Sequence, residues 1–147
     1  MFSIESVMSK ELVTIGPGGS LADARELLQS NRIHHLPVVD DGGTLVGLLT
    51  LTDLLAATDS ILRGDAERIH ADEISVEDVM VTDLATIDEQ ASLRQSALFL
   101  EKHRIGCLPV VADGKLKGII TDTDFVAIAI NLLELLEETE PVDEQYA

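Results

Sequence analysis

The chain carries one pattern twice, at a nearly constant spacing. The segment 7–39, which opens with Val-Met and closes with Leu-Pro-Val-Val, returns 72 residues later as 79–111. The segment 47–53, with the pattern Gly-h-h-Thr-x-Thr-Asp (h is apolar), returns 71 residues later as 118–124. The one missing residue falls between them, in a turn rich in Asp and Gly, where a deletion costs least. The 147-residue chain is therefore a tandem duplication, and its fold must consist of two similar units.

Each copy predicts the element order β-α-β-β-α, an α/β (α+β) fold. In the first copy we expect a strand at 12–15, a helix from 21 to 31 capped by Ser20 with Asp23 in the capping-box position, a hairpin of strands 36–39 and 45–50, and a helix at 53–62. In the second copy Ser92 and Gln95 repeat the cap of a helix ending near His103. We expect repeat one at 1–68, repeat two at 69–138 and an acidic tail at 139–147.

Composition excludes some classes of function. Ten basic against 27 acidic residues give a net charge of −17, and only 3% of residues are aromatic, so we expect no nucleic-acid partner. The single cysteine, Cys107, has apolar neighbours and is expected to be a buried, inert thiol in a reducing compartment. With no signal-peptide pattern and no membrane-spanning run, the expected location is cytoplasmic.

The last predicted helix, from Asp124 to about Glu138, is apolar on nearly all sides. Such a helix needs burial all round, and a domain of this size has little interior to offer. We therefore expect an interface in a homodimer, rather than burial within one chain.

These motifs resemble a pair of cystathionine-β-synthase-type (CBS) domains, the tandem unit called a Bateman module. The resemblance covers roughly residues 5–135 and rests on the Val-Met starts, the Arg-Ile-x-x-Leu-Pro-Val-Val segments and the Gly-h-h-Thr-x-Thr-Asp endings. It implies two repeats related by a pseudo-two-fold axis, dimerisation into a flat disc, and clefts that bind AMP, ADP, ATP or S-adenosylmethionine.

The resemblance assigns the ribose to Asp53 and Asp124, since a carboxylate can accept from both hydroxyls of a cis-diol. Four threonines of the same motif are candidates for hydrogen bonds to the ribose or the α-phosphate: Thr50, Thr52, Thr121 and Thr123. The alternative is that Thr52 and Thr123 only cap helices and that the aspartates only favour the helix dipole.

The adenine slot is implied at the first strand, the segment before the proline and the third strand. Its candidates are Val13, Ile33, His34, Leu48, Ala85, Ile105, Gly106 and Ile119. The two-fold arrangement predicts crossed sites, in which adenine contacts from one repeat meet the aspartate of the other. Ordinary core packing is the alternative for each aliphatic residue.

Phosphate groups would need nearby cations, and the candidates are Arg32, His35, His103 and Arg104, together with His34 and Lys102. Because His34-His35 in repeat one becomes Gly106-Cys107 in repeat two, we expect unequal occupancy of the two sites. The adjacent histidines lack further ligands nearby in sequence, so no metal site is predicted.

The expected function is that of a stand-alone sensor that binds an adenosyl ligand. The ligand would alter the packing of the dimer, and this change would regulate a separate effector enzyme or transporter. The alternative is a ligand-free scaffold that acts through its apolar last helix. Catalysis is not expected, since no nucleophile triad, phosphate loop or zinc pattern occurs, and Asp122 near Asp124 is matched by Leu51 in repeat one.

Overall fold

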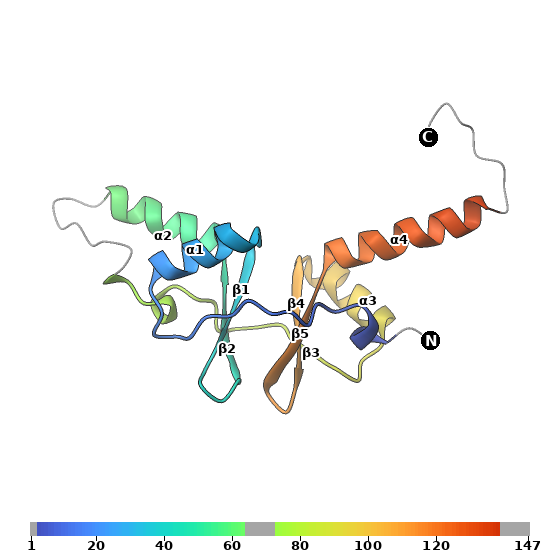
Figure 1. Ribbon diagram of the computed structural model, residues 1–147, viewed down its shortest axis with the longest axis horizontal. Coiled ribbons are helices and arrows are strands. Elements are labelled where there is room, and N and C mark those ends of the chain that lie inside the picture. Colours follow the sequence, from blue (N-terminus) through green and yellow to red (C-terminus); the bar gives the residue numbers. More distant parts are fainter. Residues whose placement is uncertain (1–2, 64–72, 139–147) are drawn as a thin grey trace.

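The computed structural model describes residues 3–63 and 73–138, with the backbone alone for 59–63. Its two halves lie side by side, each a small sheet with two helices (Figure 1). The first contains α1 (Leu21–Asn31), β1 (His35–Val39), β2 (Leu45–Thr50) and α2 (Leu51–Arg63). The second contains β3 (Ile87–Asp88), α3 (Leu93–His103), β4 (Cys107–Ala112), β5 (Lys115–Thr121) and α4 (Asp122–Glu137). Short 3-10 turns, η1 (Ile4–Ser6) and η3 (Val76–Asp78), open the repeats, and the predicted fold class is confirmed.

The capped helices and the hairpins form as the sequence predicts. Ser20 accepts a hydrogen bond from the Asp23 N–H, and Ser92 and Gln95 form a reciprocal capping box. Strands β1 and β2 pair antiparallel, as do β4 and β5, and both hairpins carry a register shift at the equivalent Val-Val step. Both first helices end in an arginine in the left-handed conformation, Arg32 at φ 53° and Arg104 at φ 51°.

Three local predictions were wrong. The expected strand at 12–15 is reduced to one parallel bridge between Ile15 and Val38, because Gly16-Pro17 follows and the chain turns away. Its counterpart β3 has only two residues. Helices α2 and α4 begin two residues earlier than expected, at Leu51 and Asp122, because each strand stops pairing at its threonine and the helix starts at once. The expected boundary between residues 68 and 69 and the expected acidic tail at 139–147 lie outside the described residues, so the domain boundaries remain a prediction.

The segments that open the two repeats are exchanged between the halves. Ile4 and Met8 are buried in the core of the second half, with Leu100, Leu108 and Ile120. Val76 is buried in the core of the first half, where Met80 also packs. Figure 1 shows the N-terminal segment running across the molecule to lie near α3. Each sheet therefore borrows an edge from the other repeat.

Backbone hydrogen bonds fix this exchange. The N–H of Ser9 donates to the Ile119 carbonyl at 2.9 Å, and the Ile119 N–H donates back at 3.1 Å. The equivalent pair, Leu48 and Val81, forms the same two bonds at 2.9 and 2.8 Å. The exchange brings the segment after each Val-Met against the third strand of the other repeat, where the cavities described below lie.

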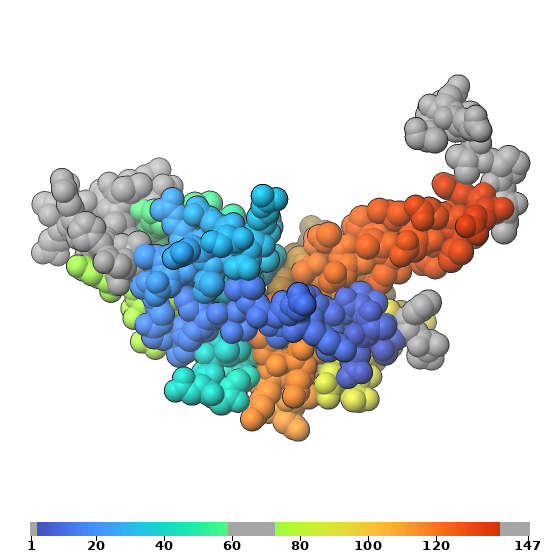
Figure 2. Space-filling model, viewed as in Figure 1, coloured from blue at the N-terminus to red at the C-terminus, as the bar shows by residue number. Residues whose placement is uncertain are grey.

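Helix α4 projects from the body, and no described residue of it is buried (Figure 2). Val126, Ile130 and Leu133 are each at least 50% exposed. Burial of this helix within one chain is thus excluded for the described residues. No helix in the described ranges combines the length and the apolar run that a membrane span requires.

Candidate ligand-binding cavities

The first cavity, of about 290 Å³, lies between the two repeats. Repeat one lines it with Leu12, Val13 and the Ile33–His35 segment. Repeat two lines it with Ile119 at the end of β5 and with residues 121–123, where α4 begins. In Figure 2 the molecule is hollowed between the first-repeat helices and α4. Apolar side chains from repeat one thus meet the threonines of repeat two in this cavity, whereas Asp124, which the prediction of crossed sites places opposite the adenine contacts, does not line it.

A second cavity, of about 310 Å³, repeats this lining with the roles of the repeats reversed. Val13 is replaced by Ala85, Ile33 by Ile105, Ile119 by Leu48 and Thr121 by Thr50. The spacings are the 72 and 71 residues of the duplication. The two cavities are therefore pseudo-symmetric copies, and both are lined by His35 and Gly106.

Twelve of the predicted site residues line one or both of these two cavities. They are Val13, Ile33, His34, Ile119, Thr121 and Thr123 in the first cavity, Leu48, Thr50, Ala85 and Ile105 in the second, and His35 and Gly106 in both. The role of each residue remains a prediction.

The predicted ribose carboxylates adjoin the cavities without lining them. Asp124 Oδ2 accepts hydrogen bonds from the Thr121 N–H at 2.8 Å and from the Thr121 hydroxyl at 3.3 Å. Asp53 donates its backbone N–H to Thr50 Oγ1 at 3.0 Å. Both carboxylates are half-buried at the first turn of a helix, where the helix dipole favours the ionised form.

The alternative interpretation, in which Thr52 and Thr123 cap the helices, was wrong. Because the helices start at Leu51 and Asp122, the capping positions belong to Thr50 and Thr121. Thr52 and Thr123 are exposed in the first turn, and Thr123 lines the first cavity.

The phosphate candidates are dispersed. His34 and His35 reach the first cavity, whereas Arg32 lines a separate cavity of about 230 Å³ with Leu28, Gln29 and Leu51 that shares Ile33 and His34. The His103 ring packs on Phe99, with centroids 4.2 Å apart, and Arg104 ends α3. Within residues 3–63 and 73–138, no group of three or more His, Cys, Asp or Glu side chains is placed to hold a metal ion.

Burial governs the titration of two lining residues. Burial lowers the pKa of His35, the neighbouring His34 lowers it further, and Asp122 opposes the shift. Burial raises the pKa of the Cys107 thiol to about 12, and the carboxylates of Asp122 and Asp124 add to the rise. The expected inert thiol is accordingly buried and protonated at neutral pH.

Sequence reasoning missed the residues that the exchanged segments supply: Ser9, Glu11 and Leu12 in the first cavity, and Val81, Asp83 and Leu84 in the second. The signal was present, because these residues follow Val-Met in each repeat and are equivalent at the 72-residue spacing. The sequence does not show that each of these segments pairs with the third strand of the other repeat.

The model of the CBS domain family matches residues 4–60 and 76–131. The chain belongs to the CBS domain family. The two matches coincide with the two halves of the structure, and each includes the opening segment that crosses to the other half. The prediction of a CBS pair is confirmed.

Solved structures similar to this CBS pair include proteins with bound adenosyl compounds. A protein from Vibrio cholerae, provisionally assigned to acetoin utilization (AcuB), is 44% identical with a TM-score of 0.80, over 96% of this chain and 99% of that one. CBSX2, solved in complex with AMP, is 32% identical with a TM-score of 0.76, over 90% and 98% of the two chains. The CBS pair of MJ0100, solved with 5′-methylthioadenosine and S-adenosylmethionine, is 26% identical with a TM-score of 0.75, over 89% and 98%.

Curated relatives are of two kinds. A CBS domain-containing protein of Dictyostelium discoideum is 33% identical, over 89% of this chain and 93% of its own length. A homoserine O-acetyltransferase of Methanocorpusculum labreanum is also 33% identical, over 81% of this chain, but the match spans only 22% of that enzyme. A CBS pair thus occurs both as nearly a whole protein and as part of a much longer enzyme.

Proposed function

We propose that this CBS pair is a regulatory module that binds an adenosine-containing ligand in the cavities between its repeats. The observation that carries the proposal is the pseudo-symmetric pair of cavities, each combining an apolar wall from one repeat with a threonine from the end of the third strand of the other. Related CBS pairs solved with AMP and with S-adenosylmethionine support the ligand class.

The chemistry of the first cavity suits a nucleoside. Val13, Ile33 and Ile119 provide an apolar slot for the adenine ring. Thr121 presents a hydroxyl, and Asp124 Oδ1 accepts no hydrogen bond from the described residues, so this oxygen is free to accept from a ribose hydroxyl. Asp53 would play the same part beside Thr50 in the second cavity.

Homodimerisation through α4 is part of the proposal. Val126, Ile130 and Leu133 lie at helical spacings of four and three residues, so they share one face, and they are 57%, 50% and 55% exposed. A helix face of this kind is rarely left in water. A ligand that prefers one dimer geometry would alter the packing of the two copies, and this change would be read by a separate effector protein.

The same exposed helix supports a second candidate, in which the protein is a scaffold and the cavities stay empty. Ligand-dependent thermal stability separates the two. At a hundred times its dissociation constant, a ligand adds about 2.7 kcal/mol to the free energy of unfolding. For a chain of this size, that is a rise of roughly 5–10 °C in melting temperature.

We expect at least one of AMP, ADP, ATP and S-adenosylmethionine to produce such a rise at millimolar concentration. Asp124→Asn should reduce the rise for a ligand in the first cavity, and Asp53→Asn for a ligand in the second. Inosine is the matched control, since it has the ribose but not the amino group of adenine. A melting temperature unchanged by all four compounds would favour the scaffold.

A further inference from the structure

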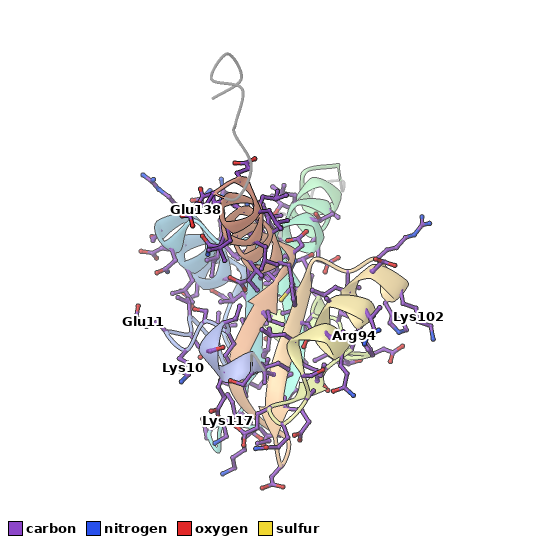
Figure 3. The ribbon with its side chains drawn as sticks, turned by 90° about the vertical axis from the view of Figure 1, so that its right-hand side faces the viewer. Lys10, Glu11, Arg94, Lys102, Lys117 and Glu138 are labelled. Carbon is purple, nitrogen blue, oxygen red and sulfur yellow. The ribbon has the colours of Figure 1, made fainter. Side chains whose placement is uncertain are left out.

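The first cavity carries acidic side chains and no fixed positive charge. Glu11 and Asp122 line it, whereas no Lys or Arg in the described part of the chain does. Arg32 lines the neighbouring cavity instead. In Figure 3, Lys102 and Arg94 lie on the opposite side of the view from Lys10 and Glu11. A phosphorylated ligand in the first cavity would therefore meet two carboxylates without a compensating lysine or arginine.

Asp122 lines this cavity as the first residue of α4, and hydrogen bonds fix both its backbone and its carboxylate. Its N–H donates to the Gly106 carbonyl at 3.1 Å, and its Oδ1 accepts from the Thr123 N–H at 2.9 Å. Its Oδ2 lies 3.5 Å from the position that a Cβ on Gly106 would occupy. Since Gly106 has no side chain, the carboxylate is not covered from this direction.

Repeat one has the same backbone arrangement without the charge. Leu51 occupies the equivalent position, and its N–H donates to the His34 carbonyl at 2.9 Å. The second cavity retains only Asp83, the counterpart of Glu11. Asp122 is thus the carboxylate that distinguishes the first cavity from its pseudo-symmetric copy.

Neither His35 nor the helix start offsets this charge. Burial and the nearby His34 lower the pKa of His35, so its imidazole is neutral at and above neutral pH. The start of α4 contributes about half a positive charge. Asp122 and Asp124, both in the first turn, contribute two full negative charges.

We propose that Asp122 makes the first cavity select adenosyl ligands whose 5′ substituent is positively charged, such as a sulfonium or an ammonium group, over 5′-phosphorylated ones. This inference rests on the proposed function, because it requires the nucleoside to bind there. A ribose held at Thr121 and Asp124 places its 5′ substituent close to the helix start, where Asp122 lies. An attraction across about 6 Å in a partly hydrated cavity amounts to roughly tenfold in affinity.

The test uses three nucleosides that differ only at the 5′ position. These are 5′-amino-5′-deoxyadenosine, which is cationic near neutral pH, adenosine, which is neutral, and AMP, which is anionic. Their dissociation constants are measured by titration calorimetry on the full chain and on Asp122→Asn. Asparagine keeps an oxygen that accepts from the Thr123 N–H, and an unchanged melting temperature confirms that the variant folds. Glu101→Gln makes the same charge change at an exposed residue of α3 that lines neither of the two proposed binding cavities.

We expect the wild type to bind the ammonium nucleoside about tenfold more tightly than adenosine, and AMP more weakly than adenosine. Asp122→Asn should reduce the first ratio to less than threefold, whereas Glu101→Gln should leave it unchanged. Tighter binding of AMP than of adenosine by the wild type would overturn the inference while the proposed function stands. A preference for the ammonium nucleoside that survives Asp122→Asn would also overturn it, since the overall net charge would then be the cause. If none of the three binds, the proposed function fails and the inference fails with it.

Discussion

Met8 packs over Gly118, a glycine of the other repeat. A Cβ on Gly118 would lie 2.5 Å from Met8 Sδ and 3.0 Å from the Ser9 carbonyl oxygen. Met80 packs over Gly47 in the same manner. The Val-Met start and the glycine of the third strand, which look like separate motifs in the sequence, are therefore two sides of one contact that joins the repeats.

This contact makes Gly118→Ala destabilising. The added methyl group has no room between the Met8 side chain and the Ser9 backbone, and overpacking of this kind costs about 1–3 kcal/mol. Chemical denaturation measures the loss. Gly18→Ala is the control, since nothing lies within 4 Å of the position of its Cβ. Combining Gly118→Ala with Met8→Ala should cost less than the sum of the two single changes. Strict additivity would show that the two residues do not contact each other.

The Cys107 thiol should resist alkylation. It is 5% exposed and its pKa is raised to about 12, so little thiolate exists at pH 8. We expect slow reaction with a thiol reagent in buffer and rapid reaction in denaturant. Because the folded pKa is above the ordinary value of 9.0, the associated stabilisation is complete below about pH 9 and is lost as the pH rises toward 12. Cys107→Ala should remove this part of the alkaline loss. Rapid alkylation of the folded protein would contradict the buried position.

Asp124 should have two separable effects. Asp124→Ala removes the carboxylate that accepts from Thr121, which costs about 1 kcal/mol of stability without any ligand. Asp124→Asn retains an oxygen that can accept from the Thr121 N–H but loses the charge, so it should weaken ligand binding with a smaller loss of stability. Denaturation in the absence of ligand measures the first effect, and calorimetric titration the second. Equal affinity in Asp124→Asn and wild type would exclude Asp124 as a ribose ligand.

Helix α4 should control the oligomeric state. Ile130→Glu places a charge on the exposed Val126–Ile130–Leu133 face and should convert a dimer into a monomer in sedimentation velocity. Asn131→Glu introduces the same charge at an exposed residue of the same helix that lies off this face, and it should leave the dimer intact. A wild-type protein that sediments as a monomer at every concentration would refute the interface.

The internal duplication made most of the fold predictable. The caps at Ser20 and Ser92, the two hairpins and the element order all follow from local patterns that recur at one spacing. The helix starts were predicted too late, because the sequence does not show that the helix follows the first threonine of Thr-x-Thr-Asp directly, with no intervening loop. Backbone pairing of Thr50 with His35 and of Thr121 with Cys107 decides this.

The cavities were predictable only in part. Their apolar walls and hydroxyls, such as Val13 and Thr121, follow from the family motifs. The contribution of Ser9 and Glu11 depends on long-range pairing with Ile119, which no local pattern encodes. The sequence analysis also did not include Asp122 among the cavity residues. The sequence shows that Asp122 is close to Asp124, but it does not show that its carboxylate lies beside Gly106.

We propose that each binding site is built from both repeats. Titration calorimetry with the most stabilising adenosyl compound tests it on four variants: Val13→Phe, Asp124→Asn, Ala85→Phe and Asp53→Asn. If each site is built from both repeats, we expect Val13→Phe and Asp124→Asn to abolish the same binding event. Ala85→Phe and Asp53→Asn should leave that event intact. If Val13→Phe and Asp53→Asn both lose one binding event while Asp124→Asn retains it, the site lies within a single repeat. That result would contradict a site built from both repeats.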